Sequence, residues 1–456
     1  MVEAGDEPRR LNPVAGWRPY QFYLVGMLLL VTVFHYLDRG ILSVLQEPLK
    51  EELKLTDGEL GLLSGPALVL LYSAAGLTVA RYAERHNRAS LLAAALATWS
   101  LMTALCGASV GFVQLALARM GVGAGEGGCI PIAQSLLADS FPIRQRGFVM
   151  SIVAAAPAVA GIITPLVGGL VAHAWGWRVA FAVVGLPGLA LALVIKFTIK
   201  EPRVLAAAPV KRSSALADVA WLMKQRAFLY IFLAAISSGI GVSGINAFKI
   251  SYLVRSQHMN LAQAGVVWSI AGVFGLAGSV IGGYVADRFA GERGRAYVLV
   301  PVIGAVGSFM AYAVAFSQSD PTLVVVACIV AALFHNLRNG PEFAAIQNIA
   351  PSRMRATVAA TYMFGATVLG GATGPLLTGA LSGVLSRRAF GQVHGGFDLA
   401  CPGGHAARGA ALDLAHACAS ASADGLRAAL LWVNIAIFLV AGLLYMSSRT
   451  IRINHD

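Results

Sequence analysis

Stretches of about 20 apolar residues recur along nearly the whole chain, and mostly short polar segments separate them. A helix of that length crosses the roughly 30 Å hydrocarbon layer of a bilayer. Only 12% of the residues are charged, whereas soluble domains contain about 25%, so a soluble fold is excluded. The sequence therefore predicts an all-α membrane protein with about twelve transmembrane helices. The predicted spans centre near Leu30, Leu70, Leu96, Gly123, Ala160, Leu189, Gly239, Gly275, Ala305, Leu333, Val368 and Ile437.

The basic residues follow a positional bias rather than forming a nucleic-acid-binding patch. The chain carries 34 Lys and Arg against 22 Asp and Glu, a net charge of +12. These cations stand singly or in pairs between apolar runs, which argues against a nucleic acid as partner. Lys and Arg collect in the cytoplasmic loops of membrane proteins. Taking the N-terminus as cytoplasmic puts loop residues such as Arg85, Arg144 and Arg288 on that side. We therefore expect both termini in the cytoplasm and the lipid bilayer as the surrounding partner.

The chain divides into two related halves. A polar linker over residues 201–226 separates them, and Pro142–Gly147 and Thr164–Gly169 of the first half are echoed by Pro351–Ala356 and Gly374–Gly379 of the second. Repeats of the same orientation imply a pseudo-two-fold axis along the membrane normal and a substrate site between the halves. The predicted divisions are a cytoplasmic tail 1–19, a six-helix bundle 20–200, the cytoplasmic linker 201–226, a six-helix bundle 227–448 with an extracytoplasmic loop 386–427, and a cytoplasmic tail 449–456.

A Gly- and Arg-rich loop stands at the same position in both halves. In the second half it contains Asp287 and Arg288, which can bridge to a neighbouring helix as a breakable cytoplasmic gate. The first half keeps a degraded copy with Glu84, Arg85 and Arg88. This loop at both repeat positions resembles the signature of the major facilitator superfamily, and the resemblance covers essentially the whole chain. It implies twelve transmembrane helices in two pseudo-symmetric six-helix bundles.

Charged residues also lie within the predicted first and fourth spans. Asp38 and Arg39 are adjacent, and ionisable groups inside a membrane are by default functional candidates. The competing interpretation for Asp38 is a salt bridge at a helix end, near Glu47 and Lys50. In the fourth span, Arg119 and Glu126 are seven residues apart, and two helical turns put them on nearly the same face. The glycines between them do not follow a strand, which argues against a dinucleotide-binding loop.

Two of these segments, Tyr36–Arg39 and Arg119–Glu126, resemble the Spinster family within that superfamily, as do Asn87, Pro131 and Asp139. The resemblance implies a monomeric transporter of a bacterial inner (plasma) membrane that moves lysophospholipids, sphingoid phosphates or related amphiphiles, with the proton as coupling ion and no other cofactor. It further implies that Asp38 and Glu126 are the protonatable pair and that Arg119 is the charge that tunes them. The same Asp-Arg pair occurs in organic-anion symporters of the superfamily, so a small organic anion or a drug stays an alternative substrate.

Further polar residues lie within the predicted spans and are candidates for the central cavity. Lys249, with Asn246, and Arg338 are candidates for binding an anionic headgroup, and His335, Arg338 and Glu342 share one helix face. Mutual neutralisation of Arg338 and Glu342 is an equal alternative. His35 is a candidate for the proton pathway or a packing histidine. The full set of cavity candidates is His35, Tyr36, Arg39, Asn246, Lys249, His335, Arg338 and Glu342.

The long extracytoplasmic loop contains Cys401 and Cys418, which can form a disulfide in an oxidising compartment, although their spacing alone does not show proximity. Its histidines are expected to be solvated, and no metal site is predicted. The sequence contains no nucleophile and base set and no phosphate-binding loop, which argues against an enzyme. A channel or a receptor is also disfavoured, because a rocking transporter needs paired gates and a pore does not.

Overall fold

The computed structural model describes residue 14 and residues 16–83, 85–202, 215–289, 295–349, 354–391, 396–407 and 409–450. Every regular element in these ranges is a helix, which confirms the predicted all-α architecture. The first half contains α1 (Pro19–Leu53), α2 (Asp57–Ser64), α3 (Pro66–Ala83), α4 (Arg88–Cys106), α5 (Phe112–Glu126), α6 (Cys129–Ser140), α7 (Ile143–Ala154), α8 (Ala156–Trp175) and α9 (Trp177–Thr198).

The second half begins with α10 (Ala215–Lys224), which lies inside the predicted linker. It continues with α11 (Arg226–Gln257), α12 (Leu261–Arg288), α13 (Ala296–Ser317), α14 (Pro321–Asn336), α15 (Asn339–Ile349), α16 (Arg355–Met363), the π-helical turn η2 (Phe364–Gly371), α17 (Ala372–Phe390), α18 (Phe397–Ala400), the 3₁₀ turn η4 (Pro402–Gly404) and α19 (Leu412–Thr450).

Eleven helices of the described chain are long and apolar enough to cross a membrane. The fourth predicted span is not among these eleven, because it is divided into α5 and α6 at Gly127 and Gly128; the described helices are consistent with the twelve predicted spans. A side chain at Gly127 would meet the carbonyl oxygen of Tyr72, so glycine permits this close approach of α3. The corresponding helix of the second half is interrupted between α14 and α15, at Leu337 and Arg338.

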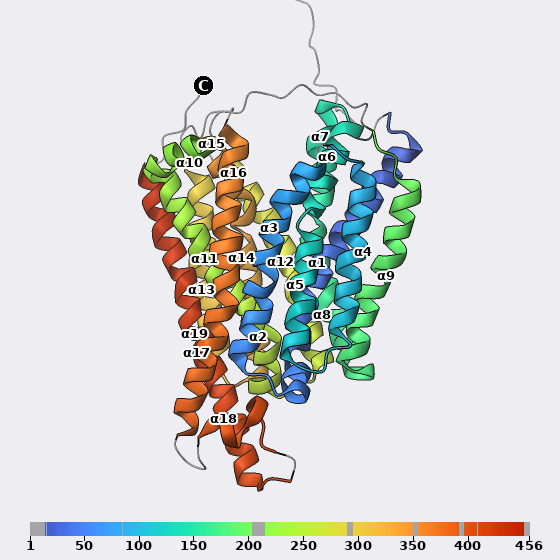
Figure 1. Cartoon of the computed structure of the whole chain (residues 1–456). Coiled ribbons are helices and arrows are strands. Elements are labelled where there is room, and N and C mark those ends of the chain that lie inside the picture. Colours follow the sequence, from blue (N-terminus) through green and yellow to red (C-terminus); the bar gives the residue numbers. More distant parts are fainter. Residues whose placement is uncertain are drawn as a thin grey trace, which may run out of the picture.

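Figure 1 shows the helices as a bundle with its long axes roughly parallel. Helix α1 begins and α19 ends at the same end of the bundle, which we call the terminal end (Figure 1). Helices α2 and α18 lie at the opposite end, which we call the distal end. Two distal loops are shorter than the sequence predicts. The first apolar span is expected to be followed by a loop over residues 46–59, but α1 continues to Leu53 and α2 begins at Asp57. The loop predicted over 386–427 is helical up to Phe390 and again from Leu412, since its alanine-rich second part favours helix.

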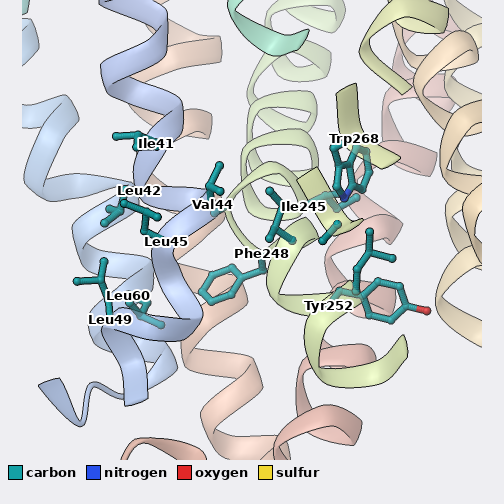
Figure 2. Packing of buried hydrophobic residues seen from close by; sticks show 14 of the residues in the cluster. Ile41, Leu42, Val44, Leu45, Leu49, Leu60, Ile245, Phe248, Tyr252 and Trp268 are labelled. Carbon is teal, nitrogen blue, oxygen red and sulfur yellow. The ribbon is translucent and has the colours of Figure 1, made fainter. Parts of the chain in front are cut away.

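The halves meet through small residues and through an apolar core. Helix α8 packs against α12 where Gly169 of α8 lies against Gly265 and the Leu261 carbonyl of α12, and we call this contact the glycine seam. Toward the distal end, one apolar cluster contains leucines of α1 and α2 together with Phe248 and Tyr252 of α11. Figure 2 shows Phe248 pointing from α11 toward α1. This packing fixes the two halves around a space between them.

Candidate functional site

A cavity of about 700 Å³ lies between the two halves, and both contribute to its wall. Its lining is mostly small and apolar residues with several hydroxyl and amide groups. Arg39 from α1 and Lys249 from α11 are the charged side chains of this lining within the described chain, and both are cations. Tyr36 and Asn246, also predicted as cavity residues, line it too. The cavity is therefore suited to a molecule with a negative charge and apolar surface.

Arg39 connects the cavity to a buried carboxylate. Its Nε lies 3.1 Å from Glu126 Oε2, and its guanidinium lies 4.2 Å from the ring centroid of Tyr72. The Arg39 side chain keeps 21% of its surface exposed, whereas that of Glu126 is fully buried at the end of α5. Arg39 thus stands between Glu126 and the cavity, in contact with both.

Asp38, His35 and Arg119 lie behind the cavity wall rather than in it. Asp38 and His35 are fully buried, and Arg119 is 1% exposed. His35 Nδ1 is 3.7 Å from Glu126, and Arg119 Nη1 donates a hydrogen bond of 3.1 Å to the backbone carbonyl of Asp38. The structure therefore brings together the predicted protonatable residues of α1 and α5, and the cation at Glu126 is Arg39 rather than Arg119.

Lys249 has a different environment from Arg39. Its Nζ donates to Asn246 Oδ1 at 3.1 Å and lies 4.5 Å from the ring centroid of Trp268. Among the described residues, no carboxylate forms an ion pair with it. An ammonium group inside a membrane protein with an aromatic face and an amide as neighbours can accept an anionic ligand without first breaking an ion pair.

The other second-half candidates do not line the cavity. Arg338 donates to Glu342 Oε2 at 3.1 Å from Nε and 2.9 Å from Nη2, and Tyr362 donates to the other oxygen at 2.9 Å. Both charged residues are buried, so the structure matches mutual neutralisation rather than exposure to a headgroup. His335 lies in the last turn of α14 and is not part of the cavity lining.

The predicted gate residues at the terminal end make contacts within their own halves. Arg88 forms ion pairs with Asp139 of the first half and with Glu201, the first residue of the predicted linker, at 2.7 Å and 2.5 Å. Asp287 accepts a hydrogen bond from Tyr297 at 2.8 Å. Arg85 and Arg288 are exposed, and Glu84 lies outside the described residues. Within the described chain, no ion pair joins these residues across the halves.

The polar contacts across the halves lie instead in the middle and at the distal end. Arg255 of α11 holds Asp57 with two hydrogen bonds of 2.9 Å and 2.8 Å and also pairs with Glu47 of α1. Lys50 of α1 pairs with Asp57 at 2.7 Å, and Ser382 of α17 donates to the same carboxylate. We call Glu47, Lys50, Asp57 and Arg255 the distal cluster. The structure is thus joined distally, as a transporter open at its terminal end would be.

Sequence reasoning missed most of the distal cluster. From the sequence, Glu47 and Lys50 are expected only as partners of Asp38. Lys50 is twelve residues after Asp38 on α1, which puts the two residues about 18 Å apart along the helix. The signal that was available is Thr56-x-x-Glu59, a capping box that begins α2 and sets Asp57 at its first position. Tyr72, Asn339 and Tyr362 were also missed, since single uncharged residues in apolar helices carry no sequence pattern of their own.

The two loop cysteines are joined. Cys401 and Cys418 form a disulfide that connects the short turn after α18 to α19. Cys106, Cys129 and Cys328 are free and buried within helices. The disulfide lies at the distal end, away from the central cavity (Figure 1).

Comparisons with known proteins agree with this geometry. A family profile for the Major Facilitator Superfamily matches residues 28–395. An MFS-type efflux pump of Mycolicibacterium smegmatis is 32% identical over 383 residues, which cover 84% of this chain and 88% of the relative. A probable L-galactonate transporter of Escherichia coli is 28% identical over 377 residues, 77% of this chain and 81% of the relative.

A solved structure is also similar over nearly the whole chain. It is a crystal structure of a bacterial homolog of the human lysosomal transporter Spinster, in an inward-facing and occupied conformation. The two chains share 26% identity, and the match covers 97% of this chain and 100% of the other with a TM-score of 0.86. The resemblance to the Spinster family that the sequence shows in the first and fourth spans therefore extends to the whole fold.

Proposed function

The chain belongs to the major facilitator superfamily and is a membrane transporter rather than an enzyme, and from that premise we propose what it carries. We propose a proton-coupled secondary active transporter, working by alternating access, for a lipid-like amphiphile of the lysophospholipid or sphingoid-phosphate class. The observation that carries the proposal is a cavity with two cations and no acid in its described lining, one of the cations held by a buried carboxylate.

The cavity has the chemistry of an anionic amphiphile. Arg39 offers a planar fork of donors that suits a phosphate, and Lys249 offers a mobile point charge. The rest of the wall includes Leu42, Ala160 and Val242, which can cover a hydrocarbon chain. A probable sphingolipid transporter, spinster homolog 1 of Arabidopsis thaliana, is 27% identical over 198 residues, 40% of this chain, and supports a lipid-like substrate. The headgroup then binds near Arg39 and Lys249, and the chain lies along the apolar wall.

The proposed coupling runs through Arg39. While Glu126 is ionised, its carboxylate holds the guanidinium at 3.1 Å and competes with an anionic substrate. When Glu126 takes up a proton, the ion pair loses its negative partner and Arg39 becomes available to the substrate. Asp38 and His35 lie next to this pair and can pass the proton on. Proton and substrate therefore bias the same equilibrium between the two open states.

The proposed orientation puts the terminal end in the cytoplasm of a bacterium and the distal end outside its inner membrane. Basic residues at the terminal end, such as Arg85 and Arg144, follow the positive-inside rule. The disulfide at the distal end requires an oxidising compartment. The proposed transporter acts as a monomer, since one chain encloses the whole cavity.

A small organic anion is the second candidate substrate. The observation that favours it is the same pair of cations, because Arg39 and Lys249 suit a carboxylate as well as a phosphate. The similarity to a probable L-galactonate transporter supports this alternative, and the similarity to an efflux pump supports a drug.

The test is substrate-induced proton movement in proteoliposomes. Purified protein is given a lysophospholipid, a sphingoid phosphate or a sugar acid, and internal pH and substrate are followed together. We expect lipid-triggered proton movement that disappears in Glu126→Gln. A signal with the sugar acid alone moves the protein to the organic-anion class, and lipid transport without proton movement contradicts the proposed coupling.

A further inference from the structure

A short segment of the second half reaches across the distal end to the first half. This segment, Phe397–Gly404, consists of α18, Cys401 and η4. Gly403 and Gly404 are buried and have φ of +71° and +81°, the left-handed region that favours glycine. A Cβ at Gly404 would meet Nζ and Cε of Lys50, and one at Gly403 would meet the Lys50 carbonyl oxygen. The segment therefore sits directly on Lys50 of α1.

The other side of the segment is fastened to its own half. The disulfide joins Cys401 to Cys418 of α19, and both cysteines are buried. Phe397 packs with Phe390 of α17 in the same small apolar cluster. The covalent and apolar contacts thus all belong to the second half, while the glycine pair contacts the first.

The segment also covers the distal cluster. Lys50 is 2% exposed and Asp57 4% exposed, although both lie near the distal surface. Ser422 of α19, next to Gly404, accepts a hydrogen bond from Arg255 Nη1 at 3.3 Å. Ion pairs that are shielded from water are screened less by salt and interact more strongly than exposed pairs. Covering Lys50 therefore strengthens the contacts that close the distal end.

We propose that Phe397–Gly404 is a disulfide-held lid that stabilises the distal-closed state. When the halves rock to open the distal end, α1 must separate from α11 and α17, so Lys50 leaves both the cluster and the lid. The lid's contacts with Lys50 exist in one state only, and such contacts shift the population toward that state. The inference concerns the gate and does not depend on the substrate or on proton coupling.

The disulfide matters because it orders the lid in advance. Cys401 and Cys418 are 17 residues apart, and closing this loop removes conformational freedom that the lid would otherwise lose on docking. A tethered lid therefore docks on Lys50 with a smaller entropic cost than a reduced one. Reduction is expected to weaken the distal-closed state without changing the central cavity.

The test measures the distance between the distal ends of the halves. Thioether-linked spin labels are placed at Val110→Cys, in the exposed α4–α5 loop, and Gln318→Cys, in the exposed α13–α14 loop. Distances in full-length protein in nanodiscs, without substrate, are compared before and after reduction and in the Cys401→Ser/Cys418→Ser variant. We expect the distal-open population to rise about fivefold or more, the lower range of allosteric coupling.

Two single variants locate the effect. Gly404→Ala keeps the disulfide but puts a methyl group against Lys50, and we expect a shift in the same direction. Leu399→Ala is the matched control, because Leu399 lies within the lid and is 83% exposed. Identical distance distributions in oxidised and reduced wild type overturn the proposal. So does a shift on reduction that Gly404→Ala does not reproduce, since the disulfide would then act elsewhere.

Discussion

The broken fourth helix of the first half and the broken tenth helix of the second half each place an acid beside the break, with different surroundings. Glu126 ends α5 and contacts Arg39, which comes from another helix and faces the cavity. Glu342 lies in the first turn of α15 and is held by Arg338, just before that helix, and by Tyr362. The same helix interruption therefore supports a cation that a ligand can reach in one half and a closed ion pair in the other.

This difference indicates how a repeated fold divides its tasks. A buried ion pair whose two charges neutralise each other, such as Arg338 and Glu342, has little reason to change partners, because separating it would leave a buried charge uncompensated. A carboxylate whose cationic partner also faces the cavity has two competing states. The first half is thus suited to proton coupling. The second half supplies a wall with Lys249, a cation that has no carboxylate partner among the described residues.

Glu126→Gln gives the largest expected effect. Glutamine cannot bind or release a proton, so proton movement driven by substrate is expected to be abolished while the fold is retained. Internal pH in proteoliposomes measures the proton movement, and circular dichroism shows whether the fold is retained. The control is Glu342→Gln, which is expected to keep proton movement; if both variants lose it equally, the two acids do not differ in function.

Glu342→Gln is expected to affect stability instead. It leaves the buried guanidinium of Arg338 without its charged partner, at a cost of about 3 to 5 kcal/mol in the free energy of unfolding. Replacing both residues, as Arg338→Met/Glu342→Leu, removes the uncompensated charge and is expected to recover much of that loss. Unfolding in detergent measures both. A double variant less stable than the single one contradicts a purely structural pair.

Lys249→Met is expected to weaken substrate binding without changing proton coupling. The ammonium has no carboxylate partner in the described chain, so its removal costs the attraction to the substrate and leaves no buried anion unpaired. We expect KM for an anionic substrate to rise about tenfold, equal to about 1.4 kcal/mol. The pH dependence of uptake should match that of wild type; a shifted pH profile assigns Lys249 to the proton pathway.

Tyr72→Leu gives the smallest expected effect. It removes the aromatic face 4.2 Å from Arg39 and leaves a smaller apolar side chain in its place. Cation–π contacts contribute about 0.5 to 1 kcal/mol, so affinity for an anionic substrate should change about two- to fivefold. Equilibrium binding in detergent measures it. An unchanged affinity would indicate that Arg39 does not contact the substrate. It would then weaken the comparison between a ligand-accessible cation in the first half and a closed ion pair in the second.

The fold could be predicted almost completely from the sequence, because span length and internal repetition depend on local composition. The elements that sequence patterns located least well are α18, η4 and the distal ends of α1 and α19. Alanine-rich and polar segments such as Leu412–Ala429 fit both a loop and a helix extension, and contacts with the neighbouring helices decide between them.

The site was predicted in part. Charges inside apolar spans identified Asp38, Arg39, Arg119, Glu126 and Lys249, since such residues are rare there. The sequence could not show that Arg39, rather than Arg119, contacts Glu126, because the partners lie on different helices and their rotation is set by packing. The pairing of Asp57 with Arg255 depends on how the two halves meet, for which no local pattern exists.

The glycine seam bears on how fast the two halves can exchange conformation, as distinct from how stably they stay together. Where Gly169 of α8 meets Gly265 of α12, backbone touches backbone and few side chains need to change rotamer as the helices pivot. The Ser269 hydroxyl near this contact can donate to the Ile162 carbonyl of α8 or to the Gly265 carbonyl of its own helix, so this hydrogen bond between the halves is also easily exchanged. In the proposed alternating-access cycle, we therefore expect the activation barrier to arise mainly where the charges of the distal cluster separate. The residues that keep the halves together would then differ from those that limit the rate of exchange between the two open states.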